Sequence, residues 1–220
     1  MSTQISFLDL PGEICNWIYR NTLVWNHSIP PKSPRKPKLP LNLLLANKKV
    51  YDETRSILYS QNSFDFITRP SPPRPTFHSP LFFLDKIGPE NSKWIESLEL
   101  QFPIIRLRGS EVELDNVSAS ILDKVQSSCP SLKRLTLDTV DTIFDGKKVF
   151  DCTLTAIKAF MWKYSLDLVA ARLRAISQQL EVTFIINSYC DCVTQGEFKA
   201  KLDTYGWKLP AYNGDSWSLA

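Results

Sequence analysis

The spacing of apolar residues predicts two helices in the N-terminal third of the chain. Between residues 11 and 23, the side chains of Ile14, Trp17 and Ile18 recur at intervals of three and four, which is typical of one helical face. A second helix is expected over residues 41–59, where apolar residues recur every seven positions and form one broad face. Both helices are too short to bury such faces alone, so we expect them to pack on the rest of the chain.

Helical and extended patterns then alternate along the chain. Strict alternation of apolar residues predicts strands at residues 64–66, 94–102, 131–139 and 180–187, and apolar steps of three and four predict helices at residues 117–128, 154–177 and 194–205. Successive units recur at intervals of about 40 residues, as in α/β repeats. We therefore expect an α+β or α/β fold, with the N-terminal helices packed on a small α/β layer of irregular, leucine-rich-repeat-like strands.

Proline residues interrupt the N-terminal region twice. Five of the fifteen prolines lie within residues 29–40 and five within residues 69–80, and neither stretch has apolar periodicity, so both are predicted to be exposed loops. The first loop holds four basic residues and no acid, namely Lys32, Arg35, Lys36 and Lys38. The net charge is +3, so without these four charges the chain carries −1. A nucleic-acid-binding surface spread over the protein is therefore not expected, and the loop is interpreted as a solvated insertion, a nuclear localisation signal or a phosphate contact.

Composition excludes several functional classes. Hydrophobic residues make up 43% of the chain, which is enough for a folded core, but no apolar run approaches the ~18 residues of a membrane span. The N-terminus does not have the pattern of a secretory signal, and the cysteine count of five is odd, which together favour a reduced protein in the cytoplasm or nucleus.

Catalytic chemistry has little support in the sequence. There is no glycine-rich phosphate loop, and the chain has two histidines. Cys190 and Cys192 lack the further ligands that zinc requires. The alternating carboxylates Glu111, Glu113 and Asp115 predict a solvated strand or loop. We therefore expect neither an enzyme nor a metal or cofactor site.

The region from residue 5 to residue 102 resembles the fungal F-box-like domains that are named for a paired Glu-x-Arg motif. The three similar segments occur in the family's order and read FLDLPGEICNWIYRNTL, LLLANKKVYDETRSILYSQNSFDF and FLDKIGPENSKWIESLEL. The second motif is present as Glu53 and Arg55, whereas the first begins at Glu13 but has Cys15 in place of arginine. We expect an F-box-like region at residues 1–102 and an α/β region at residues 103–220, joined in one compact body.

The resemblance implies a non-catalytic adaptor, which recruits an unknown protein substrate to a Skp1–cullin ubiquitin ligase. The positions that match the Skp1-binding segment are Leu10, Pro11, Ile14 and Ile18, and Trp17 can widen their face. Two alternatives remain open at this point. Leu10, Ile14 and Ile18 instead pack on the helix of residues 41–59, or the protein is a stand-alone intracellular interaction or regulatory protein without a ligase role. No membrane partner is expected.

Arg55 is predicted to be structural. It lies two positions after Glu53 on the second helix, so these two side chains do not face each other. We expect Arg55 to be buried or partly buried and to reach a carboxylate or carbonyl groups on another element, with Glu13 as one candidate.

Overall fold

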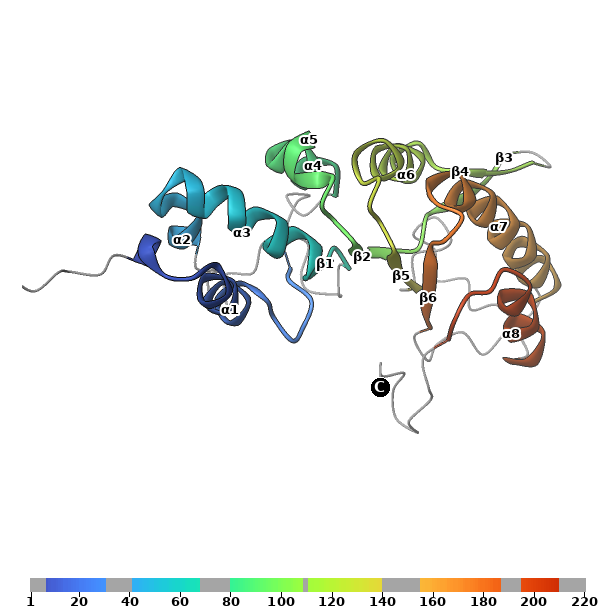
Figure 1. The fold of residues 1–220 in the computed structure, drawn as a ribbon. Helices are drawn as coiled ribbons and strands as arrows, with labels where there is room; N and C mark the ends of the chain where they lie inside the picture. Colours follow the sequence, from blue (N-terminus) through green and yellow to red (C-terminus); the bar gives the residue numbers. More distant parts are fainter. Residues whose placement is uncertain are drawn as a thin grey trace, which may run out of the picture.

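The chain forms a mixed α/β structure that combines helices with a four-stranded parallel sheet (Figure 1). A computed structural model describes residues 7–30, 41–67, 80–108, 111–139, 155–186 and 195–209. The helices are η1 (Phe7–Asp9), α1 (Gly12–Leu23), α2 (Leu41–Ala46), α3 (Lys48–Ser60), α4 (Pro80–Ile87), α5 (Pro89–Ser92), α6 (Asn116–Ser128), α7 (Thr155–Ile176) and α8 (Gln195–Thr204). The strands are β1 (Ser63–Asp65), β2 (Ser97–Gln101), β3 (Ile105–Arg108), β4 (Glu111–Leu114), β5 (Arg134–Thr139) and β6 (Glu181–Ile186).

The main sheet has four parallel strands in the order β1-β2-β5-β6, which is also their order along the chain. A parallel pair needs a long crossover, and α4 to α7 occupy these crossovers. Single bridges extend the sheet at both edges, from Ile29 to Phe64 and from Thr183 to Lys208. The predicted α/β layer is thus confirmed as a parallel sheet with helical crossovers.

The two faces of the sheet differ in chemistry because side chains alternate along each strand. One face is apolar and buried, with Phe64, Leu98, Leu135 and Val182 side by side in one row and Leu100, Leu137 and Phe184 in the next. The alternate positions on the other face are polar, with Ser63, Ser97, Arg134 and Glu181 in one row and Asp65, Glu99, Thr136 and Thr183 in another. The apolar face therefore builds the core with the helices.

Buried side chains form two cores. The helical core consists of Cys15, Tyr19, Leu23, Leu44, Val50, Ile57 and Leu58 from α1, α2 and α3. The larger sheet core includes the apolar face of the sheet and residues of α4, α6, α7 and α8. Among the described residues, Tyr59 is the one partly buried apolar side chain that packs against both cores.

The long helix predicted over residues 41–59 is two helices. Asn47 has extended backbone angles, with φ −161° and ψ 148°, and its side chain accepts a hydrogen bond from the amide of Lys49 at 2.8 Å. Asn47 therefore caps α3, and the helix is interrupted at this residue. The apolar repeat predicted one continuous helix because Leu44 and Val50, which lie on either side of the interruption, are both buried in the helical core.

Several helical predictions are confirmed closely. The predicted helices at residues 117–128, 154–177 and 194–205 correspond to α6, α7 and α8. Gly88 lies directly after α4 and Gly206 two residues after α8, and they have φ of +75° and +71°, a region that glycine adopts most readily. Trp207 folds back onto the sheet core and stacks on Phe184 at 5.6 Å between ring centroids, whereas Trp217 lies outside the described residues.

One end residue of each proline-rich segment is buried and belongs to the described secondary structure. Ile29, predicted to start an exposed loop, is buried and pairs with β1. Pro80, predicted to end the second loop, is the first residue of α4 and is buried. Both loops are therefore shorter than predicted, and residues 31–40 and 68–79 lie outside the described residues.

A two-stranded antiparallel hairpin, β3–β4, was not predicted. Its register places Arg106 opposite Glu113 and Arg108 opposite Glu111. Glu111 and Glu113 are exposed on β4, as expected for a solvated strand. Asp115 departs from that prediction, because it is buried and caps α6 by accepting a hydrogen bond from the amide of Ser118 at 2.8 Å.

Candidate interaction surface

Helix α1 carries two apolar stripes on different sides. Cys15, Tyr19 and Leu23 recur every fourth residue and are buried in the helical core. At 3.6 residues per turn, the stripe of Ile14, Trp17 and Ile18 is centred about 150° around the helix from the buried one. The two stripes therefore lie on nearly opposite sides of α1.

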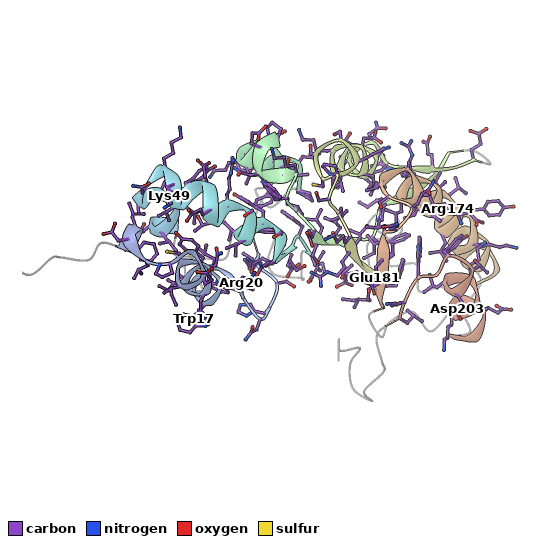
Figure 2. The ribbon with its side chains drawn as sticks, viewed as in Figure 1. Trp17, Arg20, Lys49, Arg174, Glu181 and Asp203 are labelled. Carbon is purple, nitrogen blue, oxygen red and sulfur yellow. The ribbon has the colours of Figure 1, made fainter. Side chains whose placement is uncertain are left out.

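The second stripe of α1 faces outward. The side chain of Trp17 is 67% exposed and that of Ile14 is 46% exposed, while Ile18 is half-buried. Figure 2 shows Trp17 projecting from α1 away from the remainder of the protein. We call Ile14, Trp17 and Ile18 the outer face of α1. Because this face points away from the residues 41–59, the alternative that it packs on α2 and α3 does not hold for Ile14 and Trp17.

The residues that precede α1 set the start of the helix. Pro11 is exposed and forms the N-cap, and its carbonyl accepts hydrogen bonds from the amides of Ile14 at 3.0 Å and Cys15 at 3.1 Å. Leu10 is half-buried and packs against the helical core. Of the five residues proposed for partner binding, Pro11, Ile14 and Trp17 are thus exposed together, whereas Leu10 belongs largely to the core.

Buried contacts hold α1 on α3. The hydroxyl of Tyr19 donates a hydrogen bond to Oε2 of Glu53 at 2.9 Å, and the Tyr19 ring lies 5.9 Å from that of Phe7. Burial, followed by the nearby Glu53 carboxylate, raises the pKa of Tyr19 to about 12, so the hydroxyl stays protonated at neutral pH. This bond gives Glu53 a structural role in joining α3 to α1. It does not involve the residues of the outer face of α1.

The expected pairing of Arg55 with Glu13 is wrong. Arg55 pairs with Asp52, one turn earlier on α3, at 3.5 Å, and its guanidinium lies over the ring of Tyr51 at 5.7 Å from the centroid. Glu13 is exposed on α1. The separation of Glu53 and Arg55 on the helix is as predicted. Glu53 reaches α1 through Tyr19. Arg55 faces α5, where the pKa of the Glu90 carboxyl is lowered mainly by Lys93 and also by the charge of Arg55.

No alternative site of a catalytic kind emerges from the described residues. Groups of three or more histidine, cysteine, aspartate and glutamate side chains that would hold a metal ion are absent from them. Burial raises the pKa of the Cys129 thiol to about 12, which leaves it protonated and unsuited to nucleophilic attack at neutral pH. Cys190 and Cys192 lie outside the described residues.

Comparisons with known proteins add no relative. No protein-family model, curated protein or solved structure matches this chain. None of the helices within the described ranges has the length and apolar character needed to span a bilayer.

The sequence pattern left two features unrecognised, one on α1 and one after α3. The buried stripe of Cys15, Tyr19 and Leu23 has a regular spacing of four and was detectable, but the neighbouring Ile14 and Ile18 have the same spacing. Period alone does not distinguish the inward stripe from the outward one when both are apolar. Asn62 is predicted to end the helix, but its burial had no sequence signal, because two of its three partners are backbone groups of distant residues.

Proposed function

We propose that the protein is a non-catalytic adaptor and that the outer face of α1 binds a Skp1-type protein of a cullin ubiquitin ligase. The observation that carries the proposal is the exposure of Trp17 and Ile14 on a helix that is already anchored through its opposite side. A large exposed aromatic residue beside an aliphatic one is the composition of an interface anchor. The sequence resemblance to F-box-like domains supplies the identity of the partner.

The arrangement of α1 supports this role physically. Burying an aromatic side chain of this kind removes a large apolar area from water and contributes roughly 1.5–3 kcal/mol. The helix need not rearrange to make the contact, because Tyr19 and the other buried residues already fix it on α3. A preformed helix face binds with little ordering cost.

The part of the protein that contains the sheet core, from α4 to α8, is called the sheet half, and it is the proposed recruiting region for a protein substrate. Its strands follow one another in chain order, as in solenoid repeats, where each unit stacks on the previous one. This order supports the leucine-rich-repeat-like interpretation. The face of the sheet that lacks the apolar core carries rows of polar side chains, and the exposed ones among them, such as Arg134 and Glu181, are suited to reversible recognition of a protein.

The test compares binding of a purified fungal Skp1 protein to the wild-type chain and to the double variant Ile14→Asp with Trp17→Ala, using isothermal titration calorimetry. Wild-type protein is expected to bind at micromolar concentration or tighter. Loss of an aromatic anchor costs at least about 2 kcal/mol, so the variant is expected to bind at least about 30-fold more weakly. Circular dichroism checks that the variant is folded.

A matched control is Val117→Asp on α6, whose side chain is 60% exposed and belongs to the sheet half. This variant also replaces an exposed apolar helix residue by aspartate, and its Skp1 affinity is expected to be unchanged. If wild-type protein does not bind Skp1 at micromolar concentration, the ligase role is wrong, and the stand-alone interaction protein takes its place.

A further inference from the structure

Asn62 is a buried polar residue at the junction of the two cores. It follows α3 directly, precedes β1 and is 1% exposed. Its amide nitrogen donates hydrogen bonds to the carbonyls of Leu23 at 2.9 Å and Leu58 at 2.8 Å. Its side-chain oxygen accepts a hydrogen bond from the amide of Trp25 at 2.9 Å. One side chain thus connects the end of α1, the end of α3 and the segment that leaves α1.

The partners fix the orientation of the Asn62 amide. If the group were rotated by 180°, its oxygen would face two carbonyls and its nitrogen would face an N–H group. Both donors and one acceptor position are satisfied only in the observed orientation. The bonds to the carbonyls of Leu23 and Leu58 are buried, so loss of either leaves an unsatisfied group, whereas the bond from the Trp25 amide is partly buried.

The segment that leaves α1 is held at both ends. Trp25 is bound to Asn62, and four residues later Ile29 pairs with β1 through Ile29 N to Ser63 O at 2.7 Å and Asp65 N to Ile29 O at 2.9 Å. The helical core therefore joins the sheet along two chain segments, one from α1 and one from α3. Asn62 links these two segments at the point where they enter the sheet.

The apolar contact between the helical core and the sheet core is small. Tyr59 is the shared apolar residue among those described, and it stacks on Phe64 of β1 at 5.9 Å between ring centroids. Farther along α3, the Tyr51 hydroxyl and the Asn91 amide of α5 lie within hydrogen-bond distance, at 3.2 Å. Hydrophobic contact has no directional preference, whereas hydrogen bonds do, so the hydrogen bonds between the two cores constrain their relative orientation more strongly than the apolar contact does.

We infer that Asn62 fixes the angle between the helical core and the sheet core. The consequence for an adaptor rests on the proposed function: the outer face of α1 would hold Skp1 at a set position relative to a substrate on the sheet. The inference about the angle itself needs neither partner. Asn62 is a positioning residue in this account and makes no contact with a partner.

The test measures distances between two nitroxide labels on the full chain by double electron–electron resonance. The labels replace Asn16 on α1 and Ala171 on α7, both exposed, and are introduced as genetically encoded amino acids so that the cysteines stay unchanged. A single narrow distance distribution is expected for the otherwise wild-type protein. The Asn62→Ala variant is expected to give a broader or shifted distribution.

The control is Asn21→Ala, which also removes a side-chain amide, here an exposed one that donates to the carbonyl of Trp17 at 2.8 Å within α1. Its distance distribution is expected to match that of the wild type. A folded Asn62→Ala variant with an unchanged distribution would overturn the inference.

Hydrogen exchange in the wild-type protein gives a second test that does not depend on the variant being folded. The Trp25 amide is expected to exchange as slowly as core amides of β2 and β5, because its acceptor is the buried Asn62 oxygen. Exchange as fast as that of an exposed amide would contradict the proposed role. Neither measurement contains Skp1, so failure here and failure of Skp1 binding are separate results.

Discussion

Tyr19 contributes to the structure through both its ring and its hydroxyl. The ring is fully buried in the helical core, and the hydroxyl donates to the half-buried Glu53 on α3. A hydrogen bond to a charged group contributes about 1.5–3 kcal/mol, so Tyr19→Phe is expected to lower the free energy of unfolding by about that amount. Urea titration measures the change. In a double-mutant cycle with Glu53→Ala, the two losses should not add, and strict additivity would show that the bond is not formed.

The buried Tyr19 and the partly buried Tyr59 predict a loss of stability at alkaline pH. Burial is the main cause that raises the pKa of both Tyr19 and Tyr59 from 10.0 to about 12. The folded state therefore retains these protons at a pH where the unfolded chain releases them. Stability is fully present below pH 10.0 and declines as the pH rises towards about 12. Urea unfolding at a series of pH values tests this, and Tyr19→Phe should reduce the alkaline slope.

At the scale of elements, Asn47 decides that residues 41–60 form two helices. Its side chain caps α3, and removal of such a cap costs about 1 kcal/mol, within a range of roughly 0.5–2. Asn47→Ala is therefore expected to lower the free energy of unfolding in urea by that amount. Asn42→Ala is the matched control, since Asn42 is an exposed residue within α2 where alanine is the better helix former. Equal effects of the two substitutions would contradict the capping role.

The elements that sequence patterns predict well are the long ones. Helix α7 was predicted to within a residue at each end, because its apolar residues follow a helical period over many turns. The alternating carboxylates of β4 were predicted as a solvated strand or loop, but the β3–β4 hairpin was missed because each strand has four residues, too few to indicate which segment pairs with which. At the residue scale, the outward stripe of α1 was identified as a candidate surface, but its exposure was not predictable while Ile14 and Cys15 offered two equally apolar faces.

For the whole molecule, we expect one cooperative unit. The helical and sheet cores share Tyr59, the Asn62 hydrogen bonds and the bridge of Ile29 to β1. Helices of the length of α1 and α3 are marginal without tertiary contacts. Calorimetry is therefore expected to show a single unfolding transition whose calorimetric and van't Hoff enthalpies agree. Two separated transitions would mean that the cores unfold independently.

The central claim is that the outer face of α1 is a contact surface for a Skp1-type protein. The most direct measurement is fluorine NMR of the protein labelled with 5-fluorotryptophan, which gives one resonance for each of its six tryptophans. The Trp17 resonance is assigned from its absence in Trp17→Phe. Addition of a fungal Skp1 protein is expected to shift or broaden the Trp17 resonance, while that of Trp207, buried in the sheet core, stays in place. An unchanged Trp17 resonance at saturating Skp1 would contradict the claim.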